Sequence, residues 1–293
     1  MKVELATCPA SWGVFWADGS PSYVPYELFL DHAASAGYKG IELGPVGYLP
    51  TEPAALRKEL DKRGLVARAG TACYNFDEMS GFADLEERAK SLCSLLKSFD
   101  IRYLVMMDES PAARTAEGKK AFTSARIAKN LGIIREYVDF AKTYDVTVVF
   151  HPHMNTIVET EGEIVEMMEK TNCMLCYDTG HHQVVNGKPE KGDRCAIDFY
   201  LKHHDRIPFL HFKNVDGEAM KKRAADPGFK GNVFCPLEDG VIDFKEFAEA
   251  LRAVGYDGIG VVEQDMAGEP AEKSFRLAIR NREYLQRMGV ARP

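Results

Sequence analysis

The chain has 293 residues, of which 45% are apolar and 28% charged, a composition typical of globular proteins in water. No apolar run approaches the roughly 20 residues that span a bilayer, which excludes a membrane protein. The N-terminus lacks the basic and apolar segments of a secretory signal, so we expect a cytoplasmic protein. A net charge of -7 without a basic patch argues against a nucleic-acid partner.

Short apolar or β-branched runs alternate with longer amphipathic segments along the whole chain. Eight strands are predicted at 3–8, 40–44, 65–70, 101–107, 146–151, 173–178, 207–212 and 258–263. The clearest helical segments are predicted at 53–63, 85–99, 125–144, 244–254 and 272–287. Eight strand and helix units in this length predict an α/β fold, a single (β/α)8 TIM barrel over residues 1–293. No glycine-rich nucleotide fingerprint follows the first strand.

One long segment, residues 216–240, is rich in Gly, Pro and charged residues. We expect it to be irregular and to act as a lid, because it follows the seventh strand at the end where barrels carry their active sites. The seven cysteines are scattered, as is typical of reduced thiols. Cys173 and Cys176 have CxxC spacing, but in a strand they point to opposite faces, so we do not expect a zinc pair.

Polar side chains concentrate at the ends of the last four predicted strands. Seven of the eight histidines lie between residues 151 and 211. The strand ends carry His151 and His153, then Asp178 and His181, then His211 and Lys213, and finally Glu263 and Asp265. In a barrel these ends meet at one mouth, where the chemistry of such folds is found.

A divalent metal ion explains this concentration best. Imidazole and carboxylate donors without thiolate suit Mn²⁺, Co²⁺, Fe²⁺ or Zn²⁺. The alternative, ordinary polar rim residues, would leave clustered buried carboxylates and imidazoles without a compensating cation. The sequence does not decide whether His151 or His153 is the fifth-strand ligand, and position favours His151.

Further residues are weaker candidates for contacts with substrate. Trp12 offers an apolar wall for a sugar-like ring, and Glu42 lies inside the second strand, where an unpaired carboxylate is costly. Asp108 and Glu109 follow the fourth strand. We expect His182 to point away from His181. His203 and His204 are expected at a helix end, as surface or capping residues.

These segments resemble the xylose isomerase-like barrels of the sugar phosphate isomerase/epimerase superfamily. Within it they are most similar to the branch of inosose (2-keto-myo-inositol) dehydratases. The segments that carry the resemblance are CPASWG, FHPHMNT with the Glu159 that follows, YDTGHH, HFKNV, CPLEDGVIDF and GIGVVEQDM. The resemblance covers nearly the whole chain, and the order of the motifs makes it specific.

The resemblance implies a divalent metal, Mn²⁺ or Co²⁺ first and Mg²⁺, Fe²⁺ or Zn²⁺ as other choices. It implies a small keto-sugar or inosose as substrate, with the fifth-strand group, Asp178, His211 and Glu263 as ligands and His181 near the substrate. One departure is informative. Many isomerases and epimerases of the superfamily have Glu at the end of the fifth strand, whereas this chain has His151 and His153, as in the dehydratase branch.

The expected reaction is a dehydration. A base removes the proton alpha to a ketone, the metal stabilises the enediolate, and the β-hydroxyl leaves. We expect His153 or His181 to act as acid/base, and Lys213 to hold a substrate oxygen or assist the leaving group.

The first alternative is a ketose or inosose isomerase or 3-epimerase that uses the same residues. The others are a DNA-repair endonuclease, which the net charge disfavours, and a catalytically silent carbohydrate-binding barrel. The sequence is compatible with a homo-oligomer and does not determine the oligomeric state.

Overall fold

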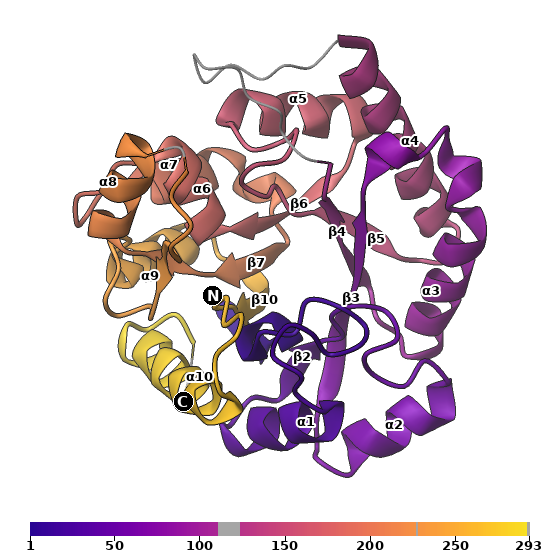
Figure 1. The fold of residues 1–293 in the computed structure, drawn as a ribbon, viewed down its shortest axis with the longest axis horizontal. Coiled ribbons are helices and arrows are strands. Elements are labelled where there is room, and N and C mark those ends of the chain that lie inside the picture. Colours follow the sequence, from indigo (N-terminus) through magenta and orange to yellow (C-terminus); the bar gives the residue numbers. More distant parts are fainter. Residues whose placement is uncertain (111–123, 227, 292–293) are drawn as a thin grey trace.

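A computed structural model describes residues 1–110, 124–226 and 228–291. Within these ranges, eight parallel strands pair in the order β1-β10-β7-β6-β5-β4-β3-β2 and close into a barrel (Figure 1). They are β1 (Lys2–Thr7), β2 (Gly40–Glu42), β3 (Val66–Tyr74), β4 (Tyr103–Asp108), β5 (Thr147–Phe150), β6 (Met174–Asp178), β7 (Phe209–Phe212) and β10 (Asp257–Val262). Each overlaps one predicted run, so the predicted barrel is confirmed.

Helices surround this barrel (Figure 1). In the described ranges they are α1 (Tyr26–Ser35), α2 (Pro53–Asp61), α3 (Glu86–Ser98), α4 (Ser124–Lys142), α5 (Glu161–Thr171), α6 (Thr179–Asn186), α7 (Cys195–His203), α8 (Gly217–Ala225), α9 (Phe244–Ala253) and α10 (Ala271–Arg287). Short 3-10 turns are η1 (Pro9–Trp12), η2 (Phe76–Glu78), η3 (Phe82–Asp84) and η4 (His204–Arg206). Several helices begin at side-chain caps. Asp178 and Asp243 accept backbone N–H groups, and Thr160 forms a capping box with Glu163.

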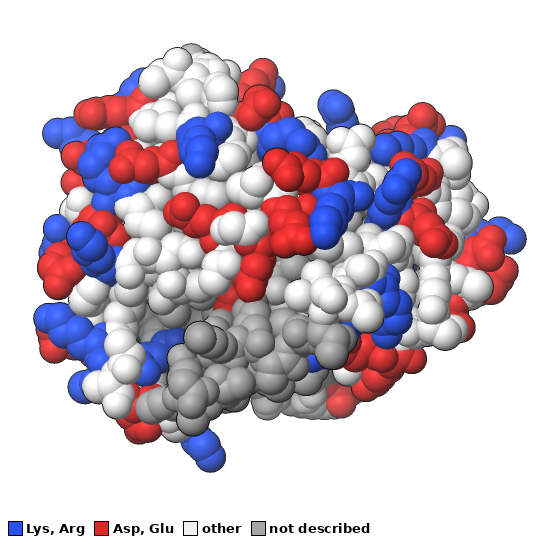
Figure 2. All heavy atoms as spheres, turned by 90° about the horizontal axis from the view of Figure 1, so that it is seen from above, with Lys and Arg blue, Asp and Glu red and all other residues white. Residues whose placement is uncertain are grey.

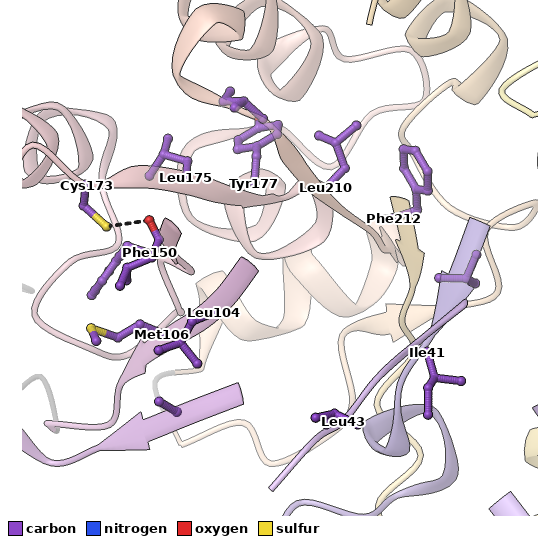
Figure 3. Close-up of a cluster of buried hydrophobic side chains, with 14 of the residues drawn as sticks. Ile41, Leu43, Leu104, Met106, Phe150, Cys173, Leu175, Tyr177, Leu210 and Phe212 are labelled. Atoms are coloured by element: carbon purple, nitrogen blue, oxygen red, sulfur yellow. Dashed lines mark hydrogen bonds between the residues drawn. The ribbon is translucent and has the colours of Figure 1, made fainter. Parts of the chain in front are cut away.

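The two faces of the strands carry different side chains. The outward face packs large residues beneath the helices, among them Leu104, Phe150, Leu175, Tyr177, Leu210 and Phe212 (Figure 3). The inward face is filled mainly by smaller residues, namely Ala6, Ala69, Val105, Val149 and Cys176, with Phe209 and Val261 beside them. Because side chains alternate along a strand, this inner layer fills the barrel and leaves its C-terminal end to the polar residues.

The segment after β7 is more regular than expected. β8 (Asn214–Val215) pairs antiparallel with β9 (Phe234–Cys235), and Asp216 caps α8 between them. The expectation of an irregular stretch over residues 216–240 was therefore wrong for α8 and β9, which the Asp216 cap and the short ladder stabilise; the other described residues of the stretch form turns and bends. Pro227, within that stretch, lies outside the described residues.

The described helices include none that is both long and apolar enough to cross a bilayer. On the face seen in Figure 2, described Lys and Arg side chains are interspersed with Asp and Glu.

Candidate metal centre

Four side chains that the sequence predicts as ligands meet at the C-terminal mouth of the barrel, and we call them the mouth cluster. His151 follows β5, Asp178 ends β6, His211 lies in β7 and Glu263 follows β10. The strand register sets Asp178 beside His211. One donor atom from each residue lies within 4.8 Å of the other three. All four residues are more than nine-tenths buried.

The mouth cluster fits a cation. Both ring nitrogens of His151 and Oδ2 of Asp178 are buried and make no hydrogen bond within the described residues, although His151 Nε2 lies 3.4 Å from that oxygen. Leaving buried polar atoms unpaired costs about 1–3 kcal/mol each. Two imidazoles and two carboxylates are donors for a borderline divalent ion. The residues therefore fit the divalent metal that the sequence predicts.

His211 is held from both sides. Its Nδ1 lies 2.7 Å from Glu263 Oε2, and its Nε2 lies 2.9 Å from Glu42 Oε2. Glu42 also accepts a hydrogen bond of 2.6 Å from Thr71 Oγ1. Burial alone would lower the pKa of His211, but Cys176, Glu263 and Glu42 raise it well above its usual value. Glu42 thus orients the His211 ring while it also borders the cavity.

Lys213 is a buried ammonium group among carboxylates. Its Nζ lies 3.5 Å from Asp178 Oδ2, 3.3 Å from Glu263 Oε2 and 3.2 Å from Asp265 Oδ1. Burial would lower the pKa of Lys213, but these carboxylates raise it well above its usual value. Lys213 therefore stays protonated and offsets part of the negative charge.

His153 and His181 lie against each other on the cavity wall, with ring centroids 3.9 Å apart and ring planes tilted by 43°. Burial, together with the nearby His151 and Lys213, lowers the pKa of His153 to about 4. Burial and His153 lower the pKa of His181 as well. Both rings are therefore neutral at neutral pH. Neither belongs to the mouth cluster, so the geometry favours His151 as the fifth-strand donor.

The mouth opens into a cavity of about 350 Å³. Trp12 does not border it, which corrects the expectation that this indole walls the substrate. The Trp12 side chain is fully buried; Nε1 donates to His32 Nδ1 at 3.1 Å, and the ring packs against Phe29. Phe15 borders the cavity instead. The η1 turn sets which of Trp12 and Phe15 faces the mouth. No sequence pattern distinguishes these two positions.

Two further residues border the cavity from the first half of the barrel. Asp108 is the last residue of β4, and this strand-end position made it a candidate in the sequence. Its Oδ1 accepts the Ser110 N–H at 2.7 Å, its Oδ2 makes no hydrogen bond within the described residues, and burial raises its pKa to about 6. Thr71, inside β3, was missed because threonine is common in strands.

Comparisons with known proteins agree with this fold. Residues 30–286 match the family model described as xylose isomerase-like TIM barrel. The chain is 30% identical to an inosose dehydratase of Geobacillus thermodenitrificans and 27% identical to one of Lacticaseibacillus casei, in each case over 97% of both chains. A solved structure titled as the IOLI protein with a binding zinc atom aligns with a TM-score of 0.71 at 16% identity, over 98% of this chain and 99% of that one.

Proposed function

The chain belongs to the xylose isomerase-like TIM barrel family, and from this premise we propose that it is a metal-dependent dehydratase, a carbon–oxygen lyase acting on an inosose or a related keto-sugar. Two inosose dehydratases match it over nearly their whole length. The observation that carries the proposal is the convergence of two imidazoles, two carboxylates and a buried ammonium group on one cavity. A cavity of about 350 Å³ suits a single monocyclic substrate.

The mouth cluster would hold the metal, with Mn²⁺ or Co²⁺ as the proposed ions. When bound there, such an ion supplies Lewis acidity that polarises a ketone and its neighbouring hydroxyl. Side chains of the protein position the ligands and exclude water from the site. Glu42 fixes the His211 ring, and the apolar inner layer beneath closes the floor of the site to water.

The acid and the base stand next to each other. A neutral imidazole, His181 or His153, accepts the proton from the carbon alpha to the ketone. The Lys213 ammonium gives a proton to the β-hydroxyl as the carbon–oxygen bond breaks, so the leaving group departs as water and an enone remains. Lys213 Nζ lies 3.2 Å from His181 Nε2, so the proton can return to the amine directly when His181 is the base. Both groups then regain their starting states.

We place this reaction in the cytoplasm, where the seven cysteines, all free here, stay reduced.

The test is turnover of a defined panel. Protein stripped with a chelator is reloaded with Mn²⁺, Co²⁺ or Zn²⁺ and incubated with inososes and ketohexoses. We expect a product lighter by one water, with the ultraviolet absorbance of an enone, from an inosose and only after metal is restored. A product of unchanged mass with inverted or moved functional groups would instead establish an isomerase or epimerase. Absence of turnover with every metal and substrate would overturn the proposal.

A further inference from the structure

A second group of ligand side chains lies outside the barrel, and we call Glu161, His182 and Cys195 the outer cluster. Glu161 is the first residue of α5, His182 lies in α6 and Cys195 is the first residue of α7. His182 directly follows His181 in the chain but points away from it, as the sequence predicts. Three helices therefore contribute one donor each to the same point.

We propose that the outer cluster is a binding site for Zn²⁺ or a similar thiophilic divalent ion, separate from the mouth. The three donor types are a thiolate sulfur, an imidazole nitrogen and a carboxylate oxygen, the set from which tetrahedral zinc sites are built. A mixed sulfur and nitrogen set selects zinc over the hard ions magnesium and calcium.

The distances between the donor atoms match such a site. His182 Nε2 lies 3.3 Å from Glu161 Oε1 and 3.6 Å from Cys195 Sγ, and the sulfur lies 3.8 Å from Glu161 Oε1. Zinc bonds of about 2.0 Å to nitrogen and oxygen and about 2.3 Å to sulfur, at tetrahedral angles, set the same pairs about 3.3 to 3.6 Å apart. The ion therefore fits between the three atoms with only small side-chain movements.

The histidine is the rigid member of the outer cluster. Its side chain is only 2% exposed and packs against the stacked rings of Tyr177 and Phe199, with ring centroids 5.2 and 4.5 Å away. Its Nδ1 makes no hydrogen bond within the described residues, so the polar contacts of the ring are those of Nε2. This buried imidazole presents Nε2 to the other two donors.

The remaining donors are anchored at helix starts. The capping box of Thr160 and Glu163 fixes the first turn of α5, and the Glu161 N–H donates to Asn186 Oδ1 of α6 at 3.1 Å. The Glu161 side chain is 48% exposed, which leaves the fourth coordination position open to water. Because the site joins the first turns of α5 and α7 to α6, its ion would stabilise the helix that follows Asp178.

Cobalt spectroscopy tests the outer cluster independently of the mouth. Co²⁺ bound by a thiolate has an intense charge-transfer band in the near ultraviolet, and the mouth cluster offers no thiolate. We expect this band on titrating the metal-free full chain with Co²⁺, and its loss when excess Zn²⁺ displaces the cobalt. Cys195→Ser should abolish the band, whereas Cys235→Ser, which removes another half-buried thiol, should retain it.

A second pair of variants keeps the test valid if Cys195→Ser does not fold. Glu161→Gln changes an exposed side chain and should weaken Co²⁺ binding at this site by at least about 100-fold. Glu166→Gln, an exposed position on the same helix, should leave it unchanged. The proposal is overturned if the wild-type chain shows no thiolate band at saturating Co²⁺, if Cys195→Ser keeps the band, or if Glu161→Gln binds as tightly as the wild type.

Discussion

His181 and His182 are neighbours on one helix, yet they belong to two different clusters. His181 lines the cavity beside Lys213, among groups brought together by the ends of parallel strands. His182 lies between helices, where one of its partners is 48% exposed. The side chains of the mouth cluster are buried around the Lys213 ammonium group, whereas the outer cluster includes the half-exposed Glu161. Changes at the mouth should therefore alter chemistry, and changes at the outer cluster should alter metal content and stability.

The largest expected effect is that of Asp178→Asn. The substitution removes a buried anionic donor but keeps a side-chain oxygen at the start of α6. In the wild-type chain this oxygen, Asp178 Oδ1, caps α6 by accepting the His181 N–H at 2.8 Å. Metal at the mouth should be lost and kcat should fall at least about 1000-fold, because the metal supplies several kcal/mol of transition-state stabilisation. Elemental analysis measures the loss of one equivalent of metal, and steady-state kinetics measure the fall in kcat. Asp205→Asn, a control in η4, should retain full activity. Full metal occupancy at the mouth in Asp178→Asn would refute the ligand assignment.

Lys213→Met should lower kcat about 100-fold, since it removes the proposed proton donor. Metal should still bind, because the four donors remain. In the metal-free protein the change leaves Asp178, Glu263 and Asp265 without their ammonium partner and should cost about 3 kcal/mol of stability. Lys221→Met, at an exposed ion pair on α8, is the matched control. Unchanged kcat in Lys213→Met would remove this residue from the mechanism.

Asp108→Asn tests the half of the mouth that contributes no member of the mouth cluster. The pKa of Asp108 is about 6 in the folded chain, above its usual 3.8, so ionisation above pH 6 opposes folding. The asparagine variant should be more stable by about 3 kcal/mol at pH 8, and this gain should vanish below about pH 4. Urea unfolding at both pH values measures it, with Asp61→Asn on the surface of α2 as control. An equal gain at both pH values would contradict the assigned ionisation.

The smallest effects are expected from substitutions that test which aromatic residue lines the cavity. Phe15→Ala should raise KM about 10-fold, since it removes an aromatic surface from the lining. Trp12→Phe should leave KM within about 2-fold and lower stability by about 1 kcal/mol, because it removes the hydrogen bond to His32. Steady-state kinetics and thermal unfolding separate the two effects. A larger KM change in Trp12→Phe than in Phe15→Ala would support the expectation that Trp12, and not Phe15, contacts the substrate.

Much of the site was accessible from local sequence pattern. Side chains alternate between the two faces of a strand, and strands begin and end at recognisable residues. The positions of Asp178, His211 and Glu263 at strand ends could therefore be predicted from the sequence. Closure of the barrel then brings strand ends together without further information. The sequence could not show whether His151 or His153 is the fifth-strand metal ligand. Both residues lie on one face and differ only in how far they follow the end of the strand.

The sequence by itself determined the barrel, the end of it that carries chemistry and the donor types found there, because hydrophobic periodicity and parallel topology are properties of local runs. The tertiary structure alone decided that Lys213 stands among three carboxylates, that Phe15 and not Trp12 faces the cavity, and that Glu161 and Cys195 meet His182. These contacts join residues far apart in the chain through helix packing and tight turns. Their geometry depends on how whole elements pack, which no local pattern encodes.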